Sequence, residues 1–89
     1  MNWEVRIPKR VLKDIKRIPK KDAKRLLAIL EEISRNPYWG DIKKIKGEEN
    51  VWRRREGGYR ILYEIHPSRK IIDIFRITRR STTTYRKRK

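Results

Sequence analysis

The chain has 89 residues, a formal net charge of +16 and no cysteine, and 43% of its side chains are charged. This length suits one small domain, and the missing cysteines exclude disulfides, zinc–thiolate sites and thiol nucleophiles. The sequence has no apolar run near the roughly 20 residues of a membrane span and no signal-peptide pattern, so we expect a cytoplasmic protein with no membrane partner.

The positive charge is concentrated in the second part of the chain. Residues 51–89 carry 13 basic and three acidic side chains, whereas residues 1–50 carry 14 and eight. Such an excess destabilises the compact state by self-repulsion, and a phosphate backbone is the commonest partner that offsets it. An acidic protein would also serve. An anionic membrane is disfavoured because the sequence lacks an apolar amphipathic stripe.

The first half of the chain predicts one strand and a pair of helices. Residues 2–7 alternate apolar and polar side chains, as a short strand does. Pro8 suits the first turn of a helix that ends before Pro19. Asp22 is expected to cap a second helix, which ends in segment 35–40. The apolar stripes of the two helices are Val11, Leu12, Ile15 and Ile18, then Leu26, Leu27, Leu30 and Ile33.

The second half predicts strands. Residues 42–46 fit a short strand or an extended entry, and strands follow at 51–55, 59–65 and 70–78. Gly57-Gly58 permits the tight turn of a hairpin between the first two of these, and residues 66–69 join the next pair. We therefore expect one α+β domain over residues 1–89. Its small antiparallel sheet, in the order strand, helix, helix and three or four strands, carries the helical hairpin on one face. A basic tail follows over residues 79–89.

Alternation along the strands separates the side chains of the hairpin into two faces. Tyr59, Ile61, Tyr63 and Ile65 point one way, while Arg60 shares the other face with Arg53 and Arg55. Arg54 falls on the core side, and we expect it to extend to water from near the hairpin tip. The three tryptophans, Trp3, Trp39 and Trp52, are expected to pack in the core.

Most enzyme signatures are absent from the sequence. It has no Gly-rich phosphate loop and no cluster of metal ligands, so we expect neither a metal nor a cofactor. His66, the single histidine, is more typical of an exposed turn. The arginine cluster on a rigid sheet instead indicates phosphate binding. Tyr85, among basic residues beyond the last strand, suits stacking on a base, proton transfer or packing on the core.

The segments 51–65, "VWRRREGGYRILYEI", 7–20, "IPKRVLKDIKRIPK", and 77–85, "ITRRSTTTY", resemble the hairpin, first helix and C-terminal end of the RelE/ParE toxin superfamily. The resemblance covers nearly the whole chain in the expected order of elements. It implies a toxin of a toxin–antitoxin pair. The RelE branch cleaves mRNA in the ribosomal A site, and the ParE branch inhibits DNA gyrase.

The resemblance also implies site residues. Arg60 matches the hairpin arginine that contacts the scissile phosphate, and Arg79 and Tyr85 match the C-terminal arginine and tyrosine. Arg53 falls where the RelE branch has a catalytic lysine, whereas Val51 stands where another lysine is expected. Arginine stays protonated, so Arg53 can stabilise charge but is a poor general base. The catalytic set is thus Arg53, Arg60, Arg79 and Tyr85, and the RNA-binding set is Lys46, Arg55, Arg80 and Arg86.

Three functions remain open at this point. In the RelE-like function, the protein is an endoribonuclease that cleaves mRNA on the ribosome, in contact with ribosomal RNA. A RelB-like antitoxin neutralises it in a hetero-oligomer. In the ParE-like function, the protein binds gyrase and has no nuclease activity. The third is a non-catalytic module that binds RNA or the ribosome, for which charge alone is sufficient and which predicts affinity that falls steeply with salt. The arginine-bearing hairpin with Arg79 and Tyr85 favours the first.

Overall fold

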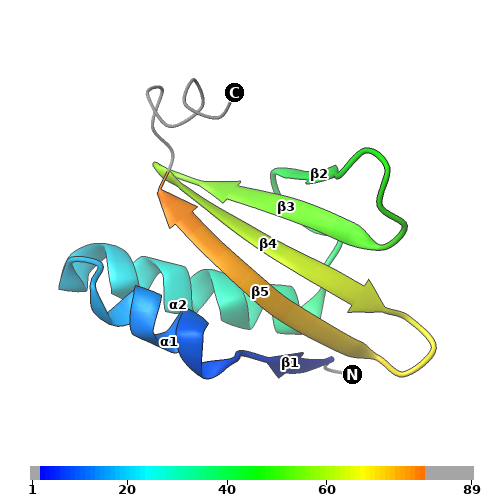
Figure 1. The fold of residues 1–89 in the computed structure, drawn as a ribbon, viewed down its shortest axis with the longest axis horizontal. Coiled ribbons are helices and arrows are strands. Elements are labelled where there is room, and N and C mark those ends of the chain that lie inside the picture. Colours follow the sequence, from blue (N-terminus) through cyan, green and yellow to red (C-terminus); the bar gives the residue numbers. More distant parts are fainter. Residues whose placement is uncertain (1–2, 80–89) are drawn as a thin grey trace.

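The computed structural model describes residues 3–79. Two helices lie against one face of a single five-stranded sheet whose strand order is β1-β5-β4-β3-β2 (Figure 1). This arrangement confirms the α+β class and the helical pair on one face. The elements in chain order are β1 (Glu4–Arg6), α1 (Lys9–Lys16), α2 (Lys20–Arg35), β2 (Ile42–Lys44), β3 (Val51–Glu56), β4 (Tyr59–His66) and β5 (Ile71–Arg79).

The sheet is mixed rather than antiparallel throughout. Strands β2 to β5 pair with antiparallel neighbours, as expected, but β1 runs parallel to β5, with Glu4 opposite Ile71. The alternation that identifies a strand carries no information about its partner, and here the first strand pairs with the last. The two helices supply the connection that returns the chain to the far edge of the sheet (Figure 1).

The hairpin between β3 and β4 has the predicted two-residue turn. Glu56 pairs with Tyr59, and Gly57 has a φ of 59°, which lies in the left-handed region that glycine adopts without steric cost. The short turn fixes which residues of β3 and β4 lie opposite each other. The facing of every arginine in the hairpin therefore follows from the turn.

The core lies between the helices and the inner face of the sheet. Both helices bury a narrower face than their sequence stripes predict, because Leu12 and Leu27 are 43% and 50% exposed. The predicted cap is also wrong: α2 begins after Pro19 without a side-chain cap. Asp22, in its first turn, instead accepts a hydrogen bond from the Tyr59 hydroxyl at 3.0 Å. The buried apolar side chains are Val11, Ile15, Leu26, Ile29, Leu30, Ile33, Tyr59, Ile61, Tyr63, Ile65, Ile71, Ile72, Ile74 and Ile77.

The tryptophans do not all pack in the core. Trp3 and Trp52 are partly buried against it, with the Tyr38 ring edge-on to both at centroid distances of 6.2 and 5.9 Å. Trp39, however, is 63% exposed, so its expected packing role is wrong. Trp39 stabilises the fold through its backbone carbonyl, which accepts a hydrogen bond from Arg54.

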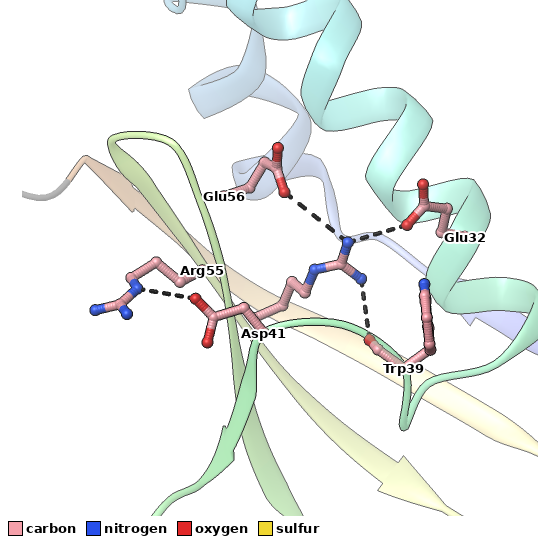
Figure 2. Close-up of polar contacts among 6 residues, drawn as sticks. Glu32, Trp39, Asp41, Arg55 and Glu56 are labelled. Carbon is pink, nitrogen blue, oxygen red and sulfur yellow. Dashed lines mark hydrogen bonds and ion pairs between the residues drawn. The ribbon is translucent and has the colours of Figure 1, made fainter.

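Arg54 is buried at 5% exposure and does not extend to water as expected. Its guanidinium lies 2.9 Å from Glu32 of α2 and 3.9 Å from Glu56 of β3, and it donates to the Trp39 carbonyl at 3.2 Å (Figure 2). Burying a cation is costly unless it is paired and hydrogen-bonded, and these partners meet that need at both terminal nitrogens, while the buried Nε has no partner within residues 3–79. Arg54 thereby ties helix α2, strand β3 and the loop between α2 and β2 together.

Gly40 makes room for this guanidinium. Its φ is +99°, and a Cβ atom at this position would lie 2.5 Å from Cζ of Arg54. Both the backbone conformation and the close approach therefore require glycine. The loop of residues 36–41 is shaped around the buried arginine, which the alternation of the strand could not reveal.

Stability should fall between about pH 10 and 12 because of Tyr63. Its side chain is fully buried and its hydroxyl donates to the Pro37 carbonyl at 2.8 Å. Burial raises the pKa of Tyr63 from 10.0 to about 12. The unfolded chain therefore loses this proton first as pH rises, and the free energy of unfolding decreases through that interval, by about 2–3 kcal/mol in all.

Urea unfolding measured at pH 9 to 12 checks this expectation. The Tyr63→Phe variant should show a flatter decline than the parent, since lysine deprotonation affects both proteins equally. Parallel curves for the two proteins would show that Tyr63 does not carry the pH dependence.

Candidate nucleic-acid interface

On strands β2, β3 and β4, three arginines and one lysine lie on the face of the sheet opposite the helices. On β5, the exposed Arg76 pairs with Leu62 of the same face. Arg55 pairs directly with Arg60 across β3 and β4, and Lys43 of β2 pairs with Arg53. Residues directly opposite in an antiparallel pair share a face, with Cβ atoms about 5 Å apart. The register therefore gives Arg53, Arg55 and Arg60 the common facing that the sequence predicts. We call Lys43, Arg53, Arg55 and Arg60 the cationic half of this open face.

The members of the cationic half differ in how their charge is balanced. Arg55 forms an ion pair with Asp41, from Nε to Oδ2 at 3.2 Å, in a largely exposed setting (Figure 2). Arg53 is half-buried, and within residues 3–79 its buried Nε has no hydrogen-bond partner. Because this Nε is shielded from solvent, an incoming phosphate would have to reach Arg53 through the terminal nitrogens of its guanidinium.

Lys46, expected to bind RNA, lies in the turn after β2 and outside the sheet pairing. Lys43 is the residue of β2 that lies on the open face, beside Arg53, and the sequence analysis did not predict a role for it. The signal was present, because in "IKKIK" a period of two puts Lys43 and Ile45 on one side and Ile42 and Lys44 on the other. Lys43 is consequently the better candidate for contact with a bound backbone.

Arg79 is not brought together with Arg60. It pairs with Tyr59 at the end of β5, and its Cζ lies 5.8 Å from the centroid of the Tyr59 ring, on the helix side. Thr78 is the β5 residue opposite Arg60. Arg79 lines a pocket of about 330 Å³ with Asp14 and residues of the adjoining helix connection. Arg79 is one residue beyond the partner of Arg60, so its side chain points to the opposite face of the sheet. The two arginines, which the resemblance assigned to one phosphate, are thus separated.

Arg80, Tyr85 and Arg86, and with them the basic tail beyond Arg79, lie outside the described residues. Their roles stay predictions.

The other half of the open face is apolar with an acidic rim. Ile45, Val51, Leu62 and Phe75 line a pocket of about 510 Å³ together with Glu48 and Glu64. A β-bulge opposite Leu62 and Tyr63 offsets the pairing with β5, and Phe75 joins this pocket. We call Ile45, Val51, Leu62 and Phe75 the apolar half. It adjoins the cationic half directly, because Leu62 is the partner of Arg53.

The far end of the open face carries the single histidine. His66 is the last residue of β4 rather than an exposed turn residue; it is half-buried, and its Nε2 lies 3.0 Å from Asp73 and 3.9 Å from Glu64. Over residues 3–79, no three or more His, Cys, Asp and Glu side chains gather in a way that could hold a metal ion. The open face is thus polarised, with cations toward the hairpin turn and carboxylates toward the other end.

The fold and the arginine-bearing face place this protein in the class of small α+β proteins with a polarised, cationic sheet face. Comparison with known proteins identifies the family. Residues 5–83 match the profile of the ParE toxin of the type II toxin–antitoxin system parDE. The chain is also 39% identical over 83 residues to a putative toxin RelE1 of Methanocaldococcus jannaschii, covering 90% of this chain and 92% of that one. The chain therefore belongs to the RelE/ParE toxin family.

Solved structures agree with this assignment. The RelE–RelB complex of Pyrococcus horikoshii contains a chain that superposes with a TM-score of 0.79 at 28% identity, over 91% of this chain and 98% of that chain. The antitoxin–toxin complex RelB–RelE of Methanococcus jannaschii gives a TM-score of 0.72 at 30% identity, over 94% and 98%. In the described part of the protein, no helix has both the length and the apolar character needed to cross a bilayer.

Proposed function

We propose that this protein is a RelE-type toxin that cleaves mRNA in the ribosomal A site. The observation that carries the proposal is the shared facing of Arg53, Arg55 and Arg60 on the open face of the sheet. Strand pairing holds these guanidinium groups in place, so they are preorganised for a phosphodiester. The RelE relative and the RelE–RelB complexes support the RelE branch.

The proposed reaction is an internal transfer within the mRNA. The 2′-oxygen of one nucleotide attacks the adjacent phosphorus, and the bond from phosphorus to the 5′-oxygen of the next nucleotide breaks. The products are a 2′,3′-cyclic phosphate and a 5′-hydroxyl, so the proton lost by the 2′-hydroxyl is balanced by the one that the leaving oxygen gains. Arg60 stabilises the extra negative charge of the transition state, and Arg53 positions the backbone beside it.

The proton acceptor is assigned to the end of the chain. Tyr85 stacks on a base and takes the 2′-hydroxyl proton if nearby cations lower its pKa, and Arg80 and Arg86 bind the backbone. Arg79 reaches the substrate only around the end of β5, so its contribution should be smaller than that of Arg60. Arginine cannot act as the base, and the ribosome supplies the orientation that the isolated protein lacks.

The antitoxin partner belongs to the same proposal. The two solved structures described above are complexes with RelB. A net charge of +16 favours a partner that is acidic overall, because association with it relieves self-repulsion. We therefore propose a cytoplasmic hetero-oligomer with a RelB-like antitoxin, which blocks the toxin until it is removed.

The test is cleavage of mRNA on programmed ribosomes by the purified protein. We expect cuts within the A-site codon and none in the same mRNA without ribosomes. Because the matching family profile is that of ParE toxins, a gyrase supercoiling assay runs in parallel. Inhibition of gyrase without mRNA cleavage would replace the RelE function by the ParE one, and salt-sensitive RNA binding with neither activity would reduce the protein to a binding module.

A further inference from the structure

We propose that the apolar half of the open face is a nucleobase pocket and that Glu64 selects bases carrying an amino group. The inference deepens the proposed RNA cleavage and rests on it. It concerns the pocket of about 510 Å³ formed by Ile45, Val51, Leu62 and Phe75 with the carboxylates of Glu48 and Glu64.

The position of the pocket relative to the arginines fits one nucleotide. Leu62 is the direct partner of Arg53, and Glu64 lies two residues further along β4, opposite Val51. Partners across the sheet are about 5 Å apart, and neighbours on one face of a strand are about 7 Å apart. A nucleotide whose phosphate lies on Arg53 can therefore place its base over Leu62 without leaving the sheet.

The charges fix the direction in which the nucleotide lies. The cationic half attracts the phosphate, while Glu48, Glu64 and Asp73 repel it from the far end. Arg76, the β5 partner of Leu62, is a further cation between the two ends. Phe75 offers an aromatic surface, and base stacking on such a ring contributes about 1–3 kcal/mol with little dependence on the base. The phosphate thus belongs to the cationic half and the base to the apolar half.

Glu64 adds discrimination to this pocket. An ionised carboxylate only accepts hydrogen bonds, and its side chain is 45% exposed, so a base edge can reach it. The exocyclic amino group of cytosine donates to such a carboxylate, as glutamate does with cytosine N4 in DNA recognition. Uracil presents a carbonyl oxygen at the same position, which the carboxylate repels. Cytosine and uracil share one shape and differ only in the polar groups at C4 and N3, so the change in their affinity ratio on replacing Glu64 measures the contribution of that carboxylate.

The experiment compares binding of 2′-O-methyl cytidine and uridine hexamers, which cannot be cleaved because they lack the 2′-hydroxyl. Fluorescence anisotropy at fixed salt should give about tenfold tighter binding of the cytidine hexamer, in line with one selective contact. Glu64→Gln should bring this ratio close to one, because the amide can donate to uracil as well as accept. Phe75→Ala should weaken both hexamers by a similar factor of about five or more.

Two controls separate selectivity from net charge and from folding. Glu49→Gln makes the same change in charge at an exposed loop residue outside the pocket, and it should keep the tenfold ratio. Near-ultraviolet circular dichroism of the Phe75→Ala protein checks that the core is intact. Equal affinities in the parent, or an unchanged ratio in Glu64→Gln, would overturn the pocket. Ribosome cleavage is scored separately, so a selective protein that cuts no mRNA would contradict only the proposed function.

Discussion

Arg60→Ala should reduce the rate of ribosome-dependent mRNA cleavage by about 10²–10³-fold, the usual effect of removing one preorganised donor to a developing negative charge. Arg60 lies on the open face, while its neighbours Tyr59 and Ile61 point into the core and fix its direction. The guanidinium binds phosphate oxygens in a fixed fork, so Arg60→Lys should restore only part of the rate. The measurement is single-turnover cleavage of mRNA on purified ribosomes.

Other arginines serve as matched controls for this result. Arg69→Ala removes an exposed cation in the turn between β4 and β5 and should leave the rate within about twofold. Arg79→Ala should lower the rate less than Arg60→Ala, because Arg79 lies against Tyr59 on the helix side. An Arg60→Ala protein with the parental rate and an unchanged fold would remove the open face from the mechanism. A larger loss for Arg79 would move the reactive phosphate to the end of β5.

Much of the fold could be predicted because its signals are local. Period-two alternation identified the hairpin strands, and Gly57-Gly58 fixed the turn, so the register of β3 on β4 and the facing of Arg53, Arg55 and Arg60 followed. The parallel pairing of β1 with β5 could not be obtained in this way, since it joins the two ends of the described chain.

The misplacements in the site have specific physical causes. Arg54 was expected in water because nothing in the local sequence shows that Glu32, in a preceding helix, reaches it. The family resemblance assigned Arg79 and Arg60 to the same phosphate. Such a pattern gives the order of residues along the chain but not the face of the strand on which each side chain lies. The apolar half was missed because Phe75 reaches it through a β-bulge, which strict alternation does not anticipate.

Arg54→Ala should lower the free energy of unfolding by about 2–4 kcal/mol, a large share of the stability of a small domain. The substitution leaves an empty site beside Gly40 and removes the hydrogen bond to the Trp39 carbonyl. Glu32 is 42% exposed and can return to water, so we expect less than the full penalty of an unpaired buried charge. Urea denaturation gives the value directly.

The neighbouring Arg55 provides the comparison that isolates burial. Arg55→Ala removes an ion pair of similar length, 3.2 Å to Asp41, but the two side chains are 39% and 57% exposed, and such pairs contribute less than about 1 kcal/mol. A double-mutant cycle of Arg54→Ala with Glu32→Ala should give a coupling of about 1 kcal/mol or more, because the partners share one hydrogen-bonded network. Equal losses for Arg54→Ala and Arg55→Ala would mean that the buried guanidinium adds no stability beyond that of a surface ion pair. The loop over residues 36–41 would then depend on its own turns and on Tyr63, whose hydroxyl holds the Pro37 carbonyl.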